Sequence, residues 1–93
     1  APVLLGGDFN SQPDDPVMRL VDEHWTRPPK PPGANLTIPS DAPRSEIDFL
    51  LYRPMEQFAV VENRVIEESM ASDHRPVLLV LAASRQPKGR GER

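Results

Sequence analysis

Three short stretches of the chain carry the side chains with the best potential for catalysis. Asp8 and Asn10 lie in GGDFN, Asp48 lies in EIDFLLYR, and Asp73 and His74 lie in SDHRPV. Carboxylate and carbonyl oxygens are the ligands that Mg²⁺ and Mn²⁺ prefer, and a hydrated cation of this kind polarises a phosphoryl group. These residue types therefore predict a Mg²⁺ or Mn²⁺ site that acts on a phosphate ester.

Each side chain suits one role around such a phosphate. Asp8 is suited to take a proton from an attacking water, and Asn10 can orient that water or donate to a phosphate oxygen without adding negative charge. His74 would donate a hydrogen bond to the phosphate, while Asp48 holds its imidazole in one tautomer and favours the charged form. Arg44, in the loop before Asp48, is a further candidate for binding phosphate through its forked donors.

Each stretch also has a purely structural explanation. Asp-Phe-Asn after two glycines is an ordinary turn sequence, Ser72-Asp73 suits a cap or a turn, and a single histidine is usually a surface residue. Taken alone, each stretch favours that explanation. The three stretches together, in this order, favour a common site at the ends of neighbouring strands.

The hydrophobic pattern predicts short strands that would position these groups. The expected strands cover residues 3–6, 46–53, 58–67 and 76–83. Gly-Gly is expected to close the first strand as a turn. In the second, Asp48 shares a face with Leu50 and Tyr52, while Phe49 lies on the opposite face. The last strand is continuously apolar, which predicts cover on both of its faces.

One helix and one long loop are expected between the first two strands. An aspartate at 14 or 15 suits the N-cap and Pro16 suits the first helical position. Val17, Leu20 and Val21 repeat at helical spacing, so a helix is expected from residue 16 toward 24 with these side chains on its buried face. Residues 25–46 show no hydrophobic period and hold six prolines, which predicts a long loop with Trp25 packed in the core at its start.

Composition limits the class of protein. The 93 residues suffice for one small domain, and a net charge of −3 argues against a broad nucleic-acid footprint, which needs surplus Lys and Arg. The absence of cysteine excludes disulfides and thiolate metal sites but leaves the compartment open. The longest apolar run is far shorter than the roughly 20 residues that span a bilayer, so no membrane span is expected.

The expected organisation is a folded unit over residues 1–83 and a polar, basic tail over 84–93. The tail is too polar to bury enough apolar surface to fold, so a solvated tail is favoured over one that binds phosphate. The chain starts with Ala and leads at once into an apolar strand. We therefore expect it to be part of a longer protein.

In their residues and in their order along the chain, GGDFN, EIDFLLYR and SDHRPV resemble motifs in the carboxyl-terminal half of the endonuclease/exonuclease/phosphatase superfamily. Deoxyribonuclease I, exonuclease III and the inositol polyphosphate phosphatases share its fold. The resemblance implies the carboxyl-terminal half of a four-layer α/β/β/α sandwich, an α/β fold in which two sheets face each other and helices lie outside. Mainly strands, one helix and a long Pro-rich loop are expected here.

The resemblance also implies roles for individual residues. Asp8 matches the acid that activates or positions the nucleophile and contributes to the metal site, and Asn10 matches its phosphate-side partner. Asp48 matches the carboxylate that orients the catalytic histidine. Asp73 matches a metal-site acid, and His74 matches the histidine that contacts the scissile phosphate.

The implied activity is that of a divalent-metal-dependent phosphoesterase, acting on a nucleic acid, a phospholipid, an inositol phosphate or a sugar phosphate. Family members carry a principal metal-binding Glu in an amino-terminal half that is missing from this sequence. We therefore expect the isolated chain to be inactive and to fold poorly without the missing amino-terminal half or a second copy. The alternative is a degenerate, non-catalytic binding domain of the same fold.

Overall fold

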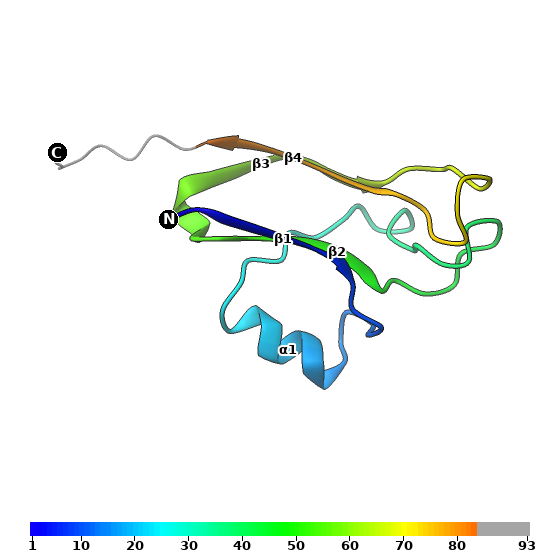
Figure 1. Cartoon of the computed structure of the whole chain (residues 1–93), viewed down its shortest axis with the longest axis horizontal. Helices are drawn as coiled ribbons and strands as arrows, with labels where there is room; N and C mark the ends of the chain where they lie inside the picture. The colour runs from blue at the N-terminus through cyan, green and yellow to red at the C-terminus, as the bar shows by residue number, and fades with distance from the viewer. Residues whose placement is uncertain (84–93) are drawn as a thin grey trace, which may run out of the picture.

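The chain forms a helical layer and two sheets that lie one above the other (Figure 1). The structure, a computed structural model, describes residues 1–83; the expected tail at 84–93 lies outside the described residues. Strands β1 (Val3–Asp8) and β2 (Asp48–Arg53) pair antiparallel in one sheet, and β3 (Phe58–Val65) and β4 (Val77–Ala83) pair antiparallel in the other. Helix α1 (Pro16–Asp22) covers the outer face of β1–β2. A short 3₁₀ helix, η1 (Met55–Gln57), joins β2 to β3.

The layers confirm the expected α/β fold class, with mainly strands, one helix and a long Pro-rich loop. They follow the α/β/β part of the expected α/β/β/α sandwich (Figure 1). Within residues 1–83, no helix covers the outer face of β3–β4. The ring of Tyr52 on β2 packs edge to face on Phe58 of β3, with 5.3 Å between centroids, so the two sheets make direct contact.

Strand β1 continues two residues beyond its expected end. Gly7 and Asp8 stay in the strand and pair with Phe49 and Asp48, so the expectation that Gly-Gly closes the strand is wrong. A Cβ atom on Gly6 would lie 2.4 Å from Cδ2 of Leu50, its paired residue on β2, so glycine at this position leaves room for the leucine side chain. The longer strand carries Asp8 to a position opposite Asp48.

The alternation predicted for β2 is confirmed. Phe49 and Leu51 are buried with Met18 of α1, whereas Tyr52, on the other face, contacts β3. Phe9 packs edge to face on Phe49, with 5.8 Å between ring centroids. The hydrophobic core therefore lies between α1 and β2, directly beneath the end of the sheet where the candidate site is found.

The buried face of α1 differs from the expected one. Met18 is fully buried, while Val17 and Leu20 are 48% and 59% exposed. Val21 is partly buried and packs against the core, as does Trp25. Met18 and Val21, at i, i+3 spacing, share one helical face through which the helix docks, and Trp25, beyond the end of the helix, packs on the same core. It ends at Asp22, before the expected residue 24.

Helix α1 begins at the predicted position, but its N-cap residue does not make a capping hydrogen bond. Asp15 occupies the N-cap and Pro16 the first turn, as predicted. The carboxylate of Asp15 makes no bond to the helix and instead accepts a hydrogen bond from the backbone N–H of Gln12 at 2.9 Å. Asp15 therefore stabilises the turn that leads from β1 into the helix.

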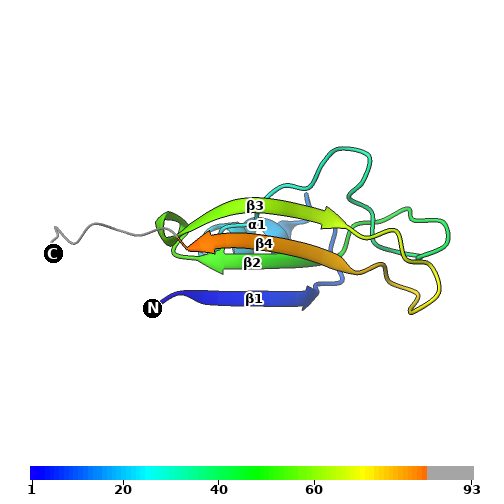
Figure 2. The same ribbon diagram turned by 90° about the horizontal axis from the view of Figure 1, so that it is seen from above.

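The expected cover on both faces of the last strand is not found within residues 1–83. Side chains of β4 are half-buried or exposed, and every residue of β1 is exposed. In Figure 2, β1 lies to one side of the outline of β3 and β4. Among residues 1–83, no helix is long and apolar enough to cross a membrane.

The segment from Trp25 to Glu46 is a loop, as predicted, but it is tied to the sheets. Thr26 forms an isolated bridge with Tyr52 of β2, and within the loop Ile38 forms one with Ser45. The side-chain amide of Asn63, on β3, donates to the carbonyls of Pro28 and Pro29. The loop therefore packs against both sheets and can position side chains at their ends.

Candidate active site

The end of the β1–β2 sheet brings together three of the predicted side chains. Asp8 and Asp48 are paired residues of the two strands, and His74 lies in the loop before β4. Nδ1 of His74 lies 2.8 Å from Oδ2 of Asp48, and Nε2 lies 3.8 Å from Oδ2 of Asp8. One potential ligand atom from each residue lies within 4.8 Å of the other two.

Backbone bonds from the Pro-rich loop hold the segment on either side of His74. The N–H of Ser40 donates to the carbonyl of Asp73 at 2.8 Å, and the N–H of Arg75 donates to the carbonyl of Thr37 at 2.7 Å. Nε of Arg75 donates to the carbonyl of Ser40 at 2.7 Å. The side chain of Arg75 therefore ties the histidine segment to the loop.

The electrostatic environment favours the protonated imidazole. The hydrogen bond to Asp48 is the largest influence and raises the pKa of His74 above its ordinary value. The charges of Asp48, Asp73 and Asp8 act in the same direction, and partial desolvation opposes them. With the His74 side chain 28% exposed, the imidazole remains accessible to a ligand from solvent.

Asn10 lies directly beside this group. Its backbone has a φ of 50°, a left-handed conformation that asparagine tolerates better than most residues. This turn directs the N–H of Asn10 to Oδ1 of Asp8 at 2.8 Å. The N–H of Phe9 donates to the carbonyl of Ile47 at 2.8 Å, which fixes the turn to the segment leading into β2. The side chain of Asn10 is exposed at the edge of the site.

The other two predicted residues stand apart from the three-residue group. Asp73 is exposed; its carboxylate accepts a hydrogen bond from Oγ of Ser72 at 3.3 Å and acts on His74 through its charge. Oγ of Ser72 in turn accepts the backbone N–H of His74 at 3.1 Å. Arg44 is exposed in the loop, with its backbone N–H donating to Ile38.

The donor set fits a hard cation on the Asp8 side of the site. Asp8 is 40% exposed, so its carboxylate is open to a hydrated ion. Oδ2 of Asp48 is already engaged by His74, which leaves Asp8 as the more available ligand. A hollow of about 230 Å³, lined in part by Asp8, Asp48 and Arg75, adjoins the group and provides space for a small ligand.

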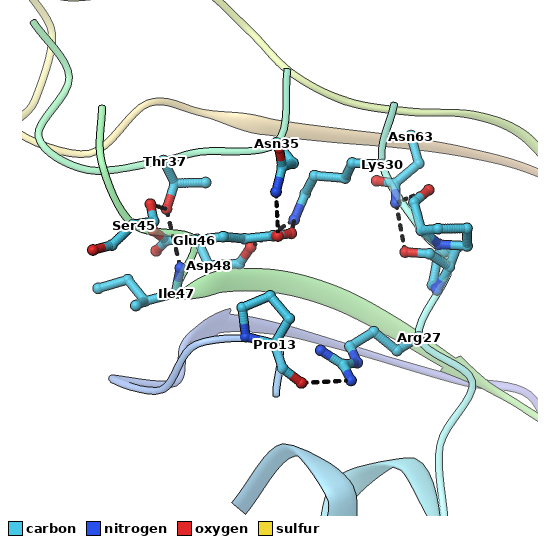
Figure 3. Close-up of polar contacts among 12 residues, drawn as sticks. Pro13, Arg27, Lys30, Asn35, Thr37, Ser45, Glu46, Ile47, Asp48 and Asn63 are labelled. Carbon is cyan, nitrogen blue, oxygen red and sulfur yellow. Dashed lines mark hydrogen bonds and ion pairs between the residues drawn. The ribbon is translucent and has the colours of Figure 1, made fainter. Parts of the chain in front are cut away.

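A buried polar cluster next to Asp48 was not predicted from the sequence (Figure 3). The ammonium of Lys30 contacts the carboxylate of Glu46 and donates to the backbone carbonyl of Asp48 at 3.1 Å. Nδ2 of Asn35 donates to Oε1 of Glu46 at 2.8 Å. One signal was available: Glu46 opens the apolar stretch that the sequence predicts as a strand, where an unpaired carboxylate would be costly. Its partners lie 11 and 16 residues away in a loop without any periodic pattern.

Comparison with known protein families shows which family the chain belongs to. The model of the Endonuclease/Exonuclease/phosphatase family matches residues 1–74, which include GGDFN, EIDFLLYR and the His74 of SDHRPV. The chain belongs to this family. No curated protein and no solved structure matches it. The family consists in general of hydrolytic enzymes, and its members commonly use divalent metals.

Proposed function

We propose that this chain carries a large part of the catalytic centre of a divalent-metal-dependent phosphoesterase. The observation that carries the proposal is the hydrogen bond between Asp48 and His74, with the Asp8 carboxylate on the other side of the imidazole. A protonated imidazole held in this way is a hydrogen-bond donor for a phosphate oxygen. The family assignment supports the same reaction class.

The residues divide the work of an attack by water on phosphorus, in which the bond from phosphorus to the leaving ester oxygen breaks and that oxygen departs and takes up a proton from solvent. Asp48 holds Nδ1 of His74, so that Nε2 is directed toward the phosphate. Asp8, oriented by the N–H of Asn10, accepts the proton of the attacking water. The exposed amide of Asn10 binds a phosphate oxygen or orients that water, and Arg44 is an additional phosphate-binding candidate from the loop.

Asp8 and Asp73 are the residues that we propose to hold Mg²⁺ or Mn²⁺. When bound, the ion supplies Lewis-acid polarisation of the phosphoryl group and neutralises charge that develops during attack. Both aspartates are exposed, so each can reach a hydrated cation without burying an unpaired charge.

The substrate class that we propose is a phosphate ester: a nucleic acid, a phospholipid, an inositol phosphate or a sugar phosphate. We further propose that these 93 residues are inactive by themselves and require the missing amino-terminal half, with its metal-binding Glu. The exposed apolar side chains of β1 and β4 support the need for such a partner. Robust hydrolysis by the 93 residues alone would contradict this part of the proposal.

The function is tested on the natural protein that contains this chain. Hydrolysis of bis(p-nitrophenyl) phosphate and of p-nitrophenyl phosphate is measured while Mg²⁺ or Mn²⁺ is titrated. We expect metal-dependent cleavage of at least one ester and a loss of roughly 10²–10⁴-fold in kcat for His74→Ala, since a positioned proton donor contributes that much. The exposed His24, as His24→Ala, is the matched control and should leave kcat unchanged.

The competing function is a degenerate binding domain that keeps the fold and has lost catalysis. Cleavage of neither ester at any metal concentration, with His74→Ala without effect, would favour that domain over an enzyme. The two esters also separate a diesterase from a monoesterase, because each carries only one kind of bond.

A further inference from the structure

We propose that Lys30, in the Pro-rich loop, is a positioning residue for Asp48. Its ammonium holds the backbone at the start of β2 and thereby fixes the direction of the carboxylate that orients His74. The inference rests on the proposed function of the Asp48–His74 pair and extends it to a residue 18 positions earlier in the chain.

The burial of Lys30 shows that it is more than a surface lysine. Its side chain is 2% exposed and that of its partner Glu46 is 9% exposed. Lysine is almost never fully buried unless it is paired, because desolvation of the ammonium is costly. Figure 3 shows Lys30, Asn35 and Glu46 converging above the start of β2. Each member of the ion pair also has a further partner: Asn35 donates to the Glu46 carboxylate, and the Lys30 ammonium donates to the carbonyl of Asp48.

The hydrogen bond to the carbonyl of Asp48 is what connects this cluster to the site. Asp48 is the first residue of β2 and pairs with Asp8, the last residue of β1, while its own carbonyl accepts the hydrogen bond from Lys30. A donor on its carbonyl oxygen fixes the peptide plane that follows Asp48 and restricts its ψ angle. Since the side chain leaves from the same Cα atom, this bond also restricts where the carboxylate lies relative to His74.

A second contact of Lys30 acts on the next residue of the strand. Its Nζ lies 4.7 Å from the ring centroid of Phe49, within the range of a cation–π interaction. Arg27 also lies over this ring, at 5.4 Å, and pairs with Asp22 on the helix. Within residues 1–83, the polar contacts of the Arg27 side chain go to Asp22 and Pro13 and not to Asp48. Arg27 is therefore a matched control that shares the ring contact but not the carbonyl contact.

The experiment separates positioning from stability by removing both charges of the buried pair. Lys30→Met combined with Glu46→Met leaves no unpaired buried charge, so this double variant should fold with stability close to that of the wild type. Two properties are measured: the downfield proton resonance of the His74 imidazole N–H that faces Asp48, in metal-free protein, and kcat and KM for bis(p-nitrophenyl) phosphate. Arg27→Met is measured in parallel.

Positioning predicts that the double variant loses or broadens the imidazole resonance through exchange with water. It also predicts a fall in kcat of roughly tenfold or more, with KM within about twofold, because small displacements of a catalytic group are costly. Arg27→Met should keep both properties. A retained resonance in the folded double variant overturns the proposal whatever happens to kcat. Absence of hydrolysis by the wild type would remove the proposed function, while the resonance would still decide the role of Lys30.

If the double variant does not fold, the wild-type protein supplies the test. A scalar coupling across the hydrogen bond from Nζ of Lys30 to the carbonyl carbon of Asp48 is expected in isotope-labelled protein. Slow exchange of the ammonium protons should accompany it, because the side chain is excluded from solvent. A flexible Lys30 with rapidly exchanging ammonium protons and without this coupling overturns the proposal.

Discussion

At the scale of single residues, His74 is the group on which the surrounding charges act. Asp48 influences it twice, by a direct hydrogen bond and by its charge, and Asp8 and Asp73 add their charges from other directions. The imidazole is partly exposed, so these interactions leave it accessible to a phosphate. The residues thus combine a favoured positive charge with an open face, which a phosphate-binding donor requires.

The raised pKa of His74 predicts how stability depends on pH in metal-free protein. Folding favours the protonated imidazole, so this contribution is fully present below the unfolded-state pKa of about 6.5. It is lost as pH rises through the higher folded-state pKa of His74. Urea unfolding at pH values from 5.5 to 9 should show the loss. Asp48→Asn should lower the pKa of His74 as followed by NMR, and an unchanged pKa in that variant would refute the assigned cause.

A single substitution in the buried pair should be far more damaging than one in a pair with an exposed aspartate. Lys30→Met leaves the Glu46 carboxylate buried without its cation and should cost about 3–5 kcal/mol of unfolding free energy. Arg27→Met removes a pair whose aspartate is 41% exposed and should cost about 0–1 kcal/mol. Urea denaturation measures both. Equal losses would show that the Lys30–Glu46 pair is solvated in solution.

At the scale of elements, the strand pairing sets the geometry of the site. The antiparallel register of β1 and β2 places Asp8 opposite Asp48, so two aspartates 40 residues apart become neighbours at one sheet end. The loop before β4 then brings His74 to the same end, held by backbone bonds to the Pro-rich loop. The loop and the first sheet therefore act together, and the helix supports them from below through the core.

The buried stripe of α1 predicts unequal effects for two residues of the same helix. Met18→Ala should cost about 2–5 kcal/mol because it opens a cavity against Phe49 and Leu51. Leu20→Ala is the control: that side chain is 59% exposed, and its removal should change stability by no more than about 0.5 kcal/mol. Thermal or urea unfolding measures the difference. A larger loss for Leu20 than for Met18 would restore the helical face expected from the sequence.

The sequence predicted the elements better than their contacts. Alternation in EIDFLLYR correctly placed Phe49 and Tyr52 on opposite faces, because one strand is enough to define that pattern. The helix was harder, since a helix of two turns offers too few residues for its apolar face to be unique. Trp25, which lies beyond the end of the helix, packs on the same core.

At the scale of the whole molecule, the apolar surface is incompletely covered. Leu4 on β1 and Val61 on β3 are each 65% exposed. An apolar cavity of about 410 Å³, lined in part by Leu50 and Leu79, lies between the sheets. The sheets are therefore packed less closely there than the interior of a typical native protein. Surfaces of this kind mark interaction sites or cause aggregation.

The isolated 93-residue chain is therefore expected to associate with itself in solution. Sedimentation velocity should show species larger than a monomer at micromolar concentration, and a hydrophobic dye should bind. Leu4→Lys together with Val61→Lys should reduce both signals, because each substitution places a charge in an exposed apolar area. A wild-type chain that is monomeric and binds no dye would contradict the expectation.

The candidate site was predictable to the extent that short motifs define it. Asp8, Asp48 and His74 were placed in one site from their motifs, and the structure brings them within 4.8 Å of one another. The contacts that support the site could not be predicted from the sequence, because Lys30, Ser40 and Arg75 all donate to backbone carbonyls. A carbonyl leaves no trace in the sequence, so a side chain that binds one cannot be found by residue type or spacing.

The central claim is that Asp48 and His74 act as one unit in phosphoester cleavage. A double-mutant cycle on kcat in the natural protein that contains this chain tests it most directly, with Asp48→Ala, His74→Ala and both together. Groups that act as a unit give strongly non-additive losses, so the double variant should be about as slow as His74→Ala alone. Losses that multiply, or single variants with wild-type kcat, would contradict the account.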